Sequence, residues 1–273
     1  MKVDLDAVAR HIAEVAAEEI MPRFGRLAEG DVEEKTPGDL VTAADKAAEL
    51  RLTPILRDAL PGSLVVGEEA TSADQKLLEH LAGEAPVWVI DPVDGTLNFA
   101  AGIPIFGVMV GLVRGGEVLA AWIHDPVRNR TMTAEAGGGT HVDGQKVRVA
   151  KPADVKRMSG NLAFHTGDRE QAARVARNAD KPASIISLRC AAADYFNLAE
   201  GRTHFALFNR TWPWDHAPGW LLHKEAGGFG QFLDNTPYRP TEVYRRLFLA
   251  PNEASWRSLV NSLALVERRQ QVR

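Results

Sequence analysis

The sequence predicts an α/β (α+β) fold for this chain of 273 residues, and three patterns support the prediction. Apolar residues recur at helical spacing in the opening segment, short apolar runs fill the middle, and helical and strand-like segments alternate after residue 150. With 45% hydrophobic residues, the chain can bury the core of one large domain or two modest ones. The change of pattern near residue 150 divides it into an N-terminal portion, 1–150, and a C-terminal portion, 151–273.

Two helices are expected before the first apolar strand. The helical pattern runs to about Ile20, and it returns from Thr42 to Leu60. The stretch 35–39 between them, KTPGD, is typical of a turn, because Pro restricts one torsion and Gly relaxes the next. Thr42 followed three residues later by Asp45 predicts a capping box at the start of the second helix.

The segment 87–149 predicts an antiparallel sheet. Gly115-Gly116 and Asp143-Gly144 are turn dipeptides that favour hairpin connections over parallel ones. The apolar or β-branched runs of this segment are VWVI, FGVMVGLV, VLAAWIH, RTMTAEA and THVDGQKVRV.

Helices and strands are expected to alternate after residue 150. A strand-like run at 185–188 precedes a helix at 191–200, and FALF at 205–208 predicts a short strand. The next helix is expected from about Asp215, as its N-cap, to Ala226, and the final segment APNEASWRSLVNSLAL predicts an amphipathic helix. Pro218 would then fall in the first helical turn, where Pro is tolerated.

Composition limits the functions that are open to the chain. The 32 basic and 36 acidic residues leave a net charge of -4, which provides no broad field for nucleic acid or anionic lipid. The apolar runs are strand-sized and the N-terminus carries acids where a signal peptide needs bases, so we expect a cytoplasmic protein without membrane contact. Cys190 is the single cysteine, which excludes an internal disulfide and disfavours, without excluding, a thiol nucleophile.

The segment WVIDPVDGTLNF is the strongest sign of chemistry. Its apolar run leads directly into Asp91 and Asp94, with Pro92 keeping the first acid extended and Gly95 permitting a sharp turn. Thr96 can begin the next helix, where unpaired N–H groups favour a phosphate. Alone, such a segment is more often an Asp-rich turn that caps a helix.

Further acids accompany this segment. Glu68 follows the apolar run SLVV, and Asp215 opens a helix, although either alone is more often a solvated corner or a helix cap. If these acids converge, their mutual repulsion raises their pKa values unless cations neutralise them. A set of oxygen ligands favours Mg²⁺ over zinc. We expect His216 to be a supporting or surface residue, because adjacent helix residues point apart.

Four segments, taken in order, resemble the motifs of the inositol monophosphatase family: KTPGDLVTAAD, GEE, DPVDGTLNF and WDHAPG…EAGG. Members of this family are lithium-sensitive, Mg²⁺-dependent phosphatases. The resemblance covers nearly the whole chain. It implies a layered α/β sandwich, αβαβα, shared with fructose-1,6-bisphosphatases. The antiparallel sheet and most metal ligands would lie in 1–150, and Asp215 with the substrate-side residues in 151–273. It also implies a homodimer.

The resemblance further implies two to three Mg²⁺ ions per subunit and the residues that hold them. Two sites would share Asp91, and Glu68 would also help to place a third ion. Water activated between the ions would hydrolyse a small phosphate monoester without a covalent intermediate. The implied metal ligands are Glu68, Asp91, the Val93 carbonyl, Asp94 and Asp215.

Catalytic and substrate-binding roles carry over in the same way. Phe208 stands where inositol-specific members commonly have an acid, which puts inositol specificity in doubt, and Arg210 is either a surface charge or a group that binds a second anion. The implied catalytic residues are Asp45 and Thr96, which would orient the attacking water, and Glu68. The implied substrate-binding residues are Asp94, Gly95, Thr96, Ala191, Phe208 and Arg210.

The substrate remains open at this stage. Relatives with the same metal core use 3′-phosphoadenosine 5′-phosphate, fructose 1,6-bisphosphate or histidinol phosphate. A regulatory role through protein contacts is the alternative of another class. The complete acid set disfavours it, because clustered carboxylates are costly to a protein that only binds a partner.

Overall fold

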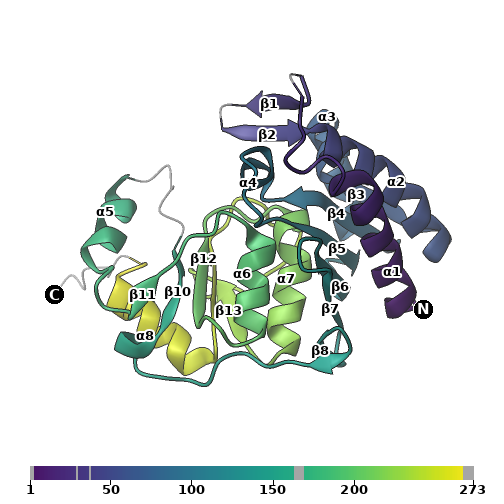
Figure 1. Cartoon of the computed structure of the whole chain (residues 1–273). Helices are drawn as coiled ribbons and strands as arrows, with labels where there is room; N and C mark the ends of the chain where they lie inside the picture. The colour runs from purple at the N-terminus through teal and green to yellow at the C-terminus, as the bar shows by residue number, and fades with distance from the viewer. Residues whose placement is uncertain (1–2, 29, 37, 163–168, 267–273) are drawn as a thin grey trace.

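The computed structural model describes residues 3–28, 30–36, 38–162 and 169–266, and it places them in five layers of helix, sheet, helix, sheet and helix (Figure 1). This arrangement confirms the predicted αβαβα sandwich. The helices are α1 (Leu5–Val15), α2 (Ala43–Ala59), α3 (Glu68–Ala73), α4 (Thr96–Ala100), α5 (Arg169–Arg177), α6 (Ala191–Ala199), α7 (Pro213–Glu225) and α8 (Glu253–Leu263). The strands are β1 (Val32–Thr36), β2 (Asp39–Thr42), β3 (Leu64–Gly67), β4 (Val87–Asp94), β5 (Gly107–Arg114), β6 (Glu117–Asp125), β7 (Arg130–Glu135), β8 (Gly139–Val142), β9 (Gln145–Lys146), β10 (Ser159–Leu162), β11 (Ser184–Ile185), β12 (Phe205–Phe208), β13 (Phe229–Phe232) and β14 (Leu247–Ala250).

The outer layer on one side consists of α1 and α2. A capping box of Thr42 and Asp45 begins α2, as the sequence predicts. The apolar faces of both helices, including Ile12 and Leu52, are fully buried in one cluster with Trp88 of the neighbouring sheet. Helix α2 packs against β3 and β4, and α1 packs against β6 and β7, so together they cover one face of the first sheet.

The first sheet has the strand order β3-β4-β5-β6-β7-β8-β9. The strands from β4 to β9 are antiparallel neighbours, which confirms the predicted hairpins, whereas β3 runs parallel to β4. The β4–β5 register shifts between Asp91 and Asp94, so regular pairing is interrupted where the two acids leave the sheet.

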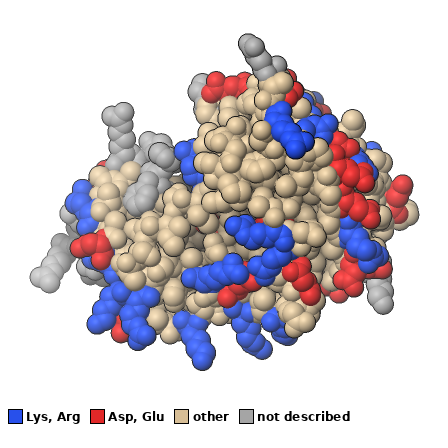
Figure 2. Space-filling model, in the orientation of Figure 1, with Lys and Arg blue, Asp and Glu red and all other residues tan. Residues whose placement is uncertain are grey.

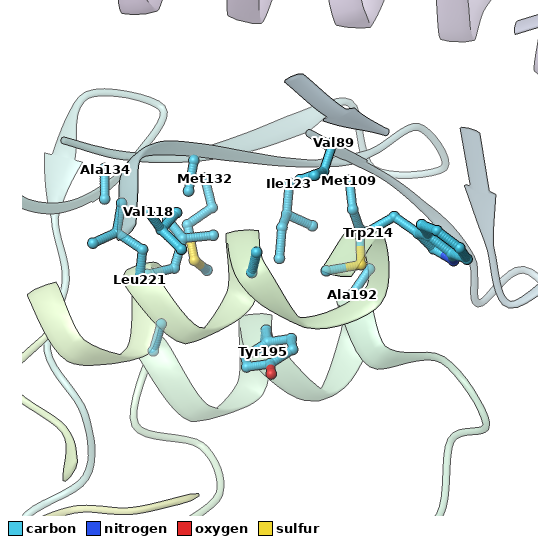
Figure 3. Packing of buried hydrophobic residues seen from close by; sticks show 14 of the residues in the cluster. Val89, Met109, Val118, Ile123, Met132, Ala134, Ala192, Tyr195, Trp214 and Leu221 are labelled. Atoms are coloured by element: carbon cyan, nitrogen blue, oxygen red, sulfur yellow. The ribbon is translucent and has the colours of Figure 1, made fainter. Parts of the chain in front are cut away.

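The central helices α6 and α7 lie between the two sheets (Figure 1). Val89, Met109 and Ile123 point from the first sheet toward these helices, as Figure 3 shows. Gly219 of α7 permits close contact with α6, because a Cβ there would lie 2.0 Å from the Cδ2 atom of Tyr195. The buried core thus joins residues from both halves of the sequence.

The second sheet has the order β11-β10-β12-β14-β13 and is covered on its outer face by α8. Trp256 and Leu259 of α8 are buried in one cluster with Phe248 of β14. The first sheet lies within residues 64–146 and the second within 159–250. The domain division at residue 150 stays a prediction, since α6 and α7 pack against both sheets.

The structure corrects two expectations about the C-terminal half. Helix α7 begins at Pro213 with Trp212 as its N-cap, so Asp215 lies in the first turn and is not the cap, and Pro218 lies inside the helix. The physical reason is that Pro is favoured at the first helical position, which moves the start toward the N-terminus. The strand expected at 185–188 is limited to β11.

The hairpin β1–β2 flanks the turn expected at 35–39; Pro37 of that turn lies outside the described residues. On the face in Figure 2, acidic side chains gather mainly beside α1 and α2, and basic side chains along the lower edge. Within the described ranges, no helix combines the length and apolar composition that crossing a bilayer requires.

Candidate active site

Three carboxylates from distant parts of the chain converge at one end of the first sheet. Each of Glu68, Asp91 and Asp215 offers an oxygen, and these oxygens all lie within 4.8 Å of one another. Glu68 follows β3 and Asp91 lies in β4; the two are adjacent because Gly67 pairs with Ile90 in parallel register. Asp215 comes from the first turn of α7. The cluster therefore forms only when both halves of the chain are in place.

The pKa values of Asp91 and Glu68 in this cluster are raised. Burial raises the pKa of Asp91 well above its usual range, and Glu68, Asp94 and Asp215 add to the shift by repulsion. Burial also raises the pKa of Glu68, where repulsion from Asp215 acts in the same direction and Lys35 opposes it. Clustered buried carboxylates destabilise a fold unless a positive charge neutralises them.

The donor set suits a hard divalent cation. The Oδ1 atom of Asp91 is buried and accepts no hydrogen bond from the described residues. An orphan carboxylate oxygen beside two further carboxylates is the environment in which Mg²⁺ or Ca²⁺ binds. These residues therefore fit the metal that the sequence implies.

Lys35 lies at the edge of the cluster. Its Nζ atom donates to Glu68 Oε1 at 2.8 Å and to Glu69 Oε1 at 2.9 Å. Burial lowers the pKa of Lys35, but the two glutamates outweigh that effect and raise the pKa above its ordinary value. Lys35 therefore remains a cation beside the acid cluster.

Asp45 and Thr96 lie side by side, as the resemblance implies. The Thr96 hydroxyl is 3.4 Å from Asp45 Oδ1 and 3.0 Å from the Val93 carbonyl oxygen. Asp45 Oδ2 accepts from the Thr42 N–H at 2.8 Å, so one carboxylate serves both the capping box and the Thr96 contact. Burial raises the pKa of Asp45 to about 6, against the hydrogen bonds from Thr42.

Asp94 is held by the start of α6. Its Oδ2 atom accepts from the Ala192 N–H at 2.6 Å and from the Cys190 thiol at 3.0 Å. Burial raises the pKa of Asp94, and hydrogen bonds from Cys190, Ala192, Ala191 and Gly95 oppose the rise. Burial and Asp94 raise the pKa of Cys190 well above its usual range, so the thiol is a hydrogen-bond donor here and has no thiolate character.

A cleft of about 390 Å³ opens beside the acid cluster. Its wall includes Arg210, whose guanidinium lies 6.0 Å from the ring centre of Trp212. Trp212 stacks on Trp214 with ring centres 5.1 Å apart. Glu68 and Asp215 also line this cleft, so a molecule bound there meets both the acids and Arg210.

Phe208 lies outside this lining. Its ring stacks on Tyr195 at 5.2 Å and lies 4.6 Å from the His216 ring. His216 is buried and not at the surface: its Nδ1 atom is 3.1 Å from the Tyr195 hydroxyl, and burial lowers its pKa to about 3. The three rings support the start of α7 from within.

Comparisons with known proteins agree with this geometry. A family model described as the inositol monophosphatase family matches residues 1–267. An inositol-1-monophosphatase from Mesorhizobium japonicum is 34% identical over 215 residues, 77% of this chain and 79% of the relative. A fructose-1,6-bisphosphatase/inositol-1-monophosphatase from Thermotoga maritima is 31% identical over 210 residues, 77% of each chain. The solved structure of an IMPase from Thermotoga maritima has a TM-score of 0.76 at 25% identity and covers 95% of both chains.

Proposed function

The chain belongs to the inositol monophosphatase family and is a phosphoric monoester hydrolase, and we propose that it hydrolyses a small phosphate monoester with Mg²⁺ and water, without a covalent intermediate. One observation carries the proposal. The oxygens of Glu68, Asp91 and Asp215 converge within 4.8 Å, and one buried oxygen of Asp91 accepts no hydrogen bond from the described residues.

Three of the proposed metal ligands, Glu68, Asp91 and Asp215, form this cluster. With Asp94 and the Val93 carbonyl, which the family resemblance adds, they would hold two to three ions. When bound, Mg²⁺ supplies positive charge that lowers the pKa of a bound water and offsets the charge of the phosphate. The same charge would relieve the repulsion that raises the pKa of Asp91.

Asp45 and Thr96 would orient the attacking water. Near neutral pH, Asp45 is mostly ionised because its pKa is about 6, so it can accept a proton through the Thr96 hydroxyl. The backbone N–H groups of Gly95 and Thr96, at the start of α4, would bind the phosphate oxygens. The protein thus supplies the base and the position of the phosphate.

The cleft suggests which substrates are preferred. Arg210 and Lys35 both line the cleft, but Lys35 is already paired with Glu68 and Glu69. Trp212 offers a flat apolar surface next to Arg210. Phe208 has no carboxylate and its ring packs against Tyr195 and His216, so this position supplies no acid for sugar hydroxyls. A second phosphate or a carboxylate on the substrate would pair with Arg210.

Phosphate release from a substrate panel tests the proposal. The panel contains inositol 1-phosphate, fructose 1,6-bisphosphate, 3′-phosphoadenosine 5′-phosphate and histidinol phosphate, each with Mg²⁺ or with EDTA. We expect Mg²⁺-dependent release, abolished in Asp91→Asn and retained in the surface control Asp143→Asn. Release that persists in EDTA would contradict the metal mechanism. No release from any ester would favour a regulatory role through protein contacts.

A further inference from the structure

A buried carboxylate from α2 holds the first turn of α3. Glu49 Oε2 accepts from the Glu69 N–H at 2.8 Å, and Glu49 Oε1 accepts from the Ala70 N–H at 2.8 Å. The first N–H groups of a helix have no partner within the helix, and Gly67, the N-cap of α3, offers no side chain to satisfy them. Glu49 therefore performs the capping role from a different helix.

The approach of Glu49 depends on the absence of a side chain at Gly67. A Cβ at Gly67 would lie 2.3 Å from the Glu49 carboxyl carbon, which is far inside contact distance. Glu49 itself is 7% exposed, and Ala48 and Leu52 beside it in α2 are fully buried. The carboxylate is thus fixed on a rigid helix and fits closely over the β3–α3 junction.

The residue enclosed by these contacts is Glu68. Glu49 touches the chain at Gly67 on one side of Glu68 and bonds Glu69 and Ala70 on the other. Lys35 contacts the Glu68 carboxylate, whereas Glu49 acts on the backbone that carries it. Loss of the Glu49 bonds would free the first turn of α3 to fray.

We propose that Glu49 is a positioning residue, which fixes the start of α3 so that the Glu68 carboxylate meets Asp91 and Asp215. This inference rests on the proposed metal-dependent function. Partners that orient metal ligands typically contribute about 10-fold to 100-fold in metal affinity. The effect of losing Glu49 should therefore appear first in Mg²⁺ binding.

Glu49→Gln is the direct test, because the amide keeps the size of the side chain and replaces one acceptor oxygen with a donor. Mg²⁺ is titrated calorimetrically into EDTA-treated protein without substrate. We expect the dissociation constant to rise about 10-fold. The substrate KM at saturating Mg²⁺ and the far-UV circular dichroism should stay near those of the wild type, which separates positioning from a general loss of structure.

Gly67→Ala should disrupt the same contact between Glu49 and the β3–α3 junction by changing the residue on the other side of it. The new methyl group would displace the Glu49 carboxylate while Glu49 itself stays intact. We expect a comparable loss of Mg²⁺ affinity, and the Glu49→Gln/Gly67→Ala double variant should lose little more than either single one, because both break one contact.

Glu225→Gln is the matched control. Glu225 accepts from the Gly137 N–H at 2.9 Å and from the Gly139 N–H at 3.1 Å, so it also binds two backbone donors. It is the last residue of α7, at the opposite end of that helix from Asp215. We expect it to bind Mg²⁺ as the wild type does.

Wild-type Mg²⁺ affinity in folded Glu49→Gln, or an equal loss of affinity in Glu225→Gln, would overturn the positioning role and leave the proposed function intact. A wild-type protein that binds no Mg²⁺ and hydrolyses no ester would remove the proposed function as well.

Discussion

At the residue scale, Asp45 combines an observed structural role with the catalytic role that we propose for it. Its two oxygens have different partners: one completes the capping box of α2 with Thr42, and the other faces Thr96. The capping pattern in the sequence was therefore a correct interpretation, and it did not exclude a second role. The helix that Asp45 caps also holds its carboxylate beside Thr96.

Removal of the Thr96 hydroxyl should affect the chemical step. In Thr96→Val, we expect kcat to fall about 100-fold, because the link between Asp45 and the attacking water is lost. Mg²⁺ affinity, measured by calorimetry, should change little.

Thr140→Val is the control, since Thr140 also donates to a carbonyl, that of Leu222, at 2.6 Å but in the core. It should lower the unfolding temperature and leave kcat near the wild-type value. Equal kcat in Thr96→Val and the wild type would contradict the role of the hydroxyl.

Asp194 gives a pH-dependent prediction. It is 7% exposed, and burial raises its pKa to about 8, against a hydrogen bond from Asn161. A raised folded-state pKa contributes stability at low pH that is lost as the pH rises from about 4 to about 8. Asp194→Asn has no carboxylate to ionise, so the difference in unfolding temperature between the variant and the wild type should increase in favour of the variant as the pH rises through this window. If the unfolding temperatures of the two proteins change in parallel from pH 5 to pH 9, the pKa of Asp194 is not raised.

At the element scale, strong local signals were enough to predict most helices and the antiparallel sheet. The capping box, the turn dipeptides and the apolar periodicity each depend on neighbours in sequence. The start of α7 was placed wrongly because Asp215 and Pro213 both favour a helix start, and Pro213 prevailed. Strands β10, β13 and β14 were not predicted, because their short runs form strands only through pairing across the second sheet.

The contact between α6 and α7 should be sensitive to added volume. In Gly219→Ala, the new methyl group would overlap the Tyr195 ring, and we expect a loss of about 1–3 kcal/mol in the free energy of unfolding, measured in urea. Gly83→Ala is the control, since a Cβ there would lie 3.2 Å from the His80 carbonyl oxygen and inside no ring. Equal stability of Gly219→Ala and the wild type would show that the helices separate easily.

At the scale of the whole molecule, we expect metal binding and folding to be coupled. The raised pKa values of Glu68, Asp91 and Asp45 mean that the metal-free protein loses stability as the pH rises and these acids ionise. Added Mg²⁺ should therefore raise the unfolding temperature, and it should do so more at pH 8 than at pH 5, where protons compete for the same oxygens. Calorimetric scans with Mg²⁺ and with EDTA at both pH values measure the increase in unfolding temperature. An equal increase at pH 5 and pH 8 would contradict the expected competition between Mg²⁺ and protons.

The homodimer and the inhibition by lithium stay predictions from the resemblance. Light scattering should give the mass of two chains, and the mass of a single chain would contradict the homodimer. Unchanged phosphate release at high LiCl would contradict the inhibition by lithium.

The acids of the site were predictable because each lies at the end of a clear strand or helix in the sequence. Their partners were less visible: Ala192 and Glu49 act through backbone bonds across more than one element, which no local pattern records. Glu49 lies four residues after Asp45, on the same side of α2, and that spacing was the one signal available for it.

The acid cluster draws Glu68 and Asp91 from the β3–β4 segment and Asp215 from the much later helix α7. A growing chain on the ribosome has made the first two long before α7 is synthesised. It therefore cannot assemble the complete cluster, and we expect nascent chains to leave the cell's phosphate esters untouched. The order of residues along the chain therefore delays the complete cluster until Asp215 has been made.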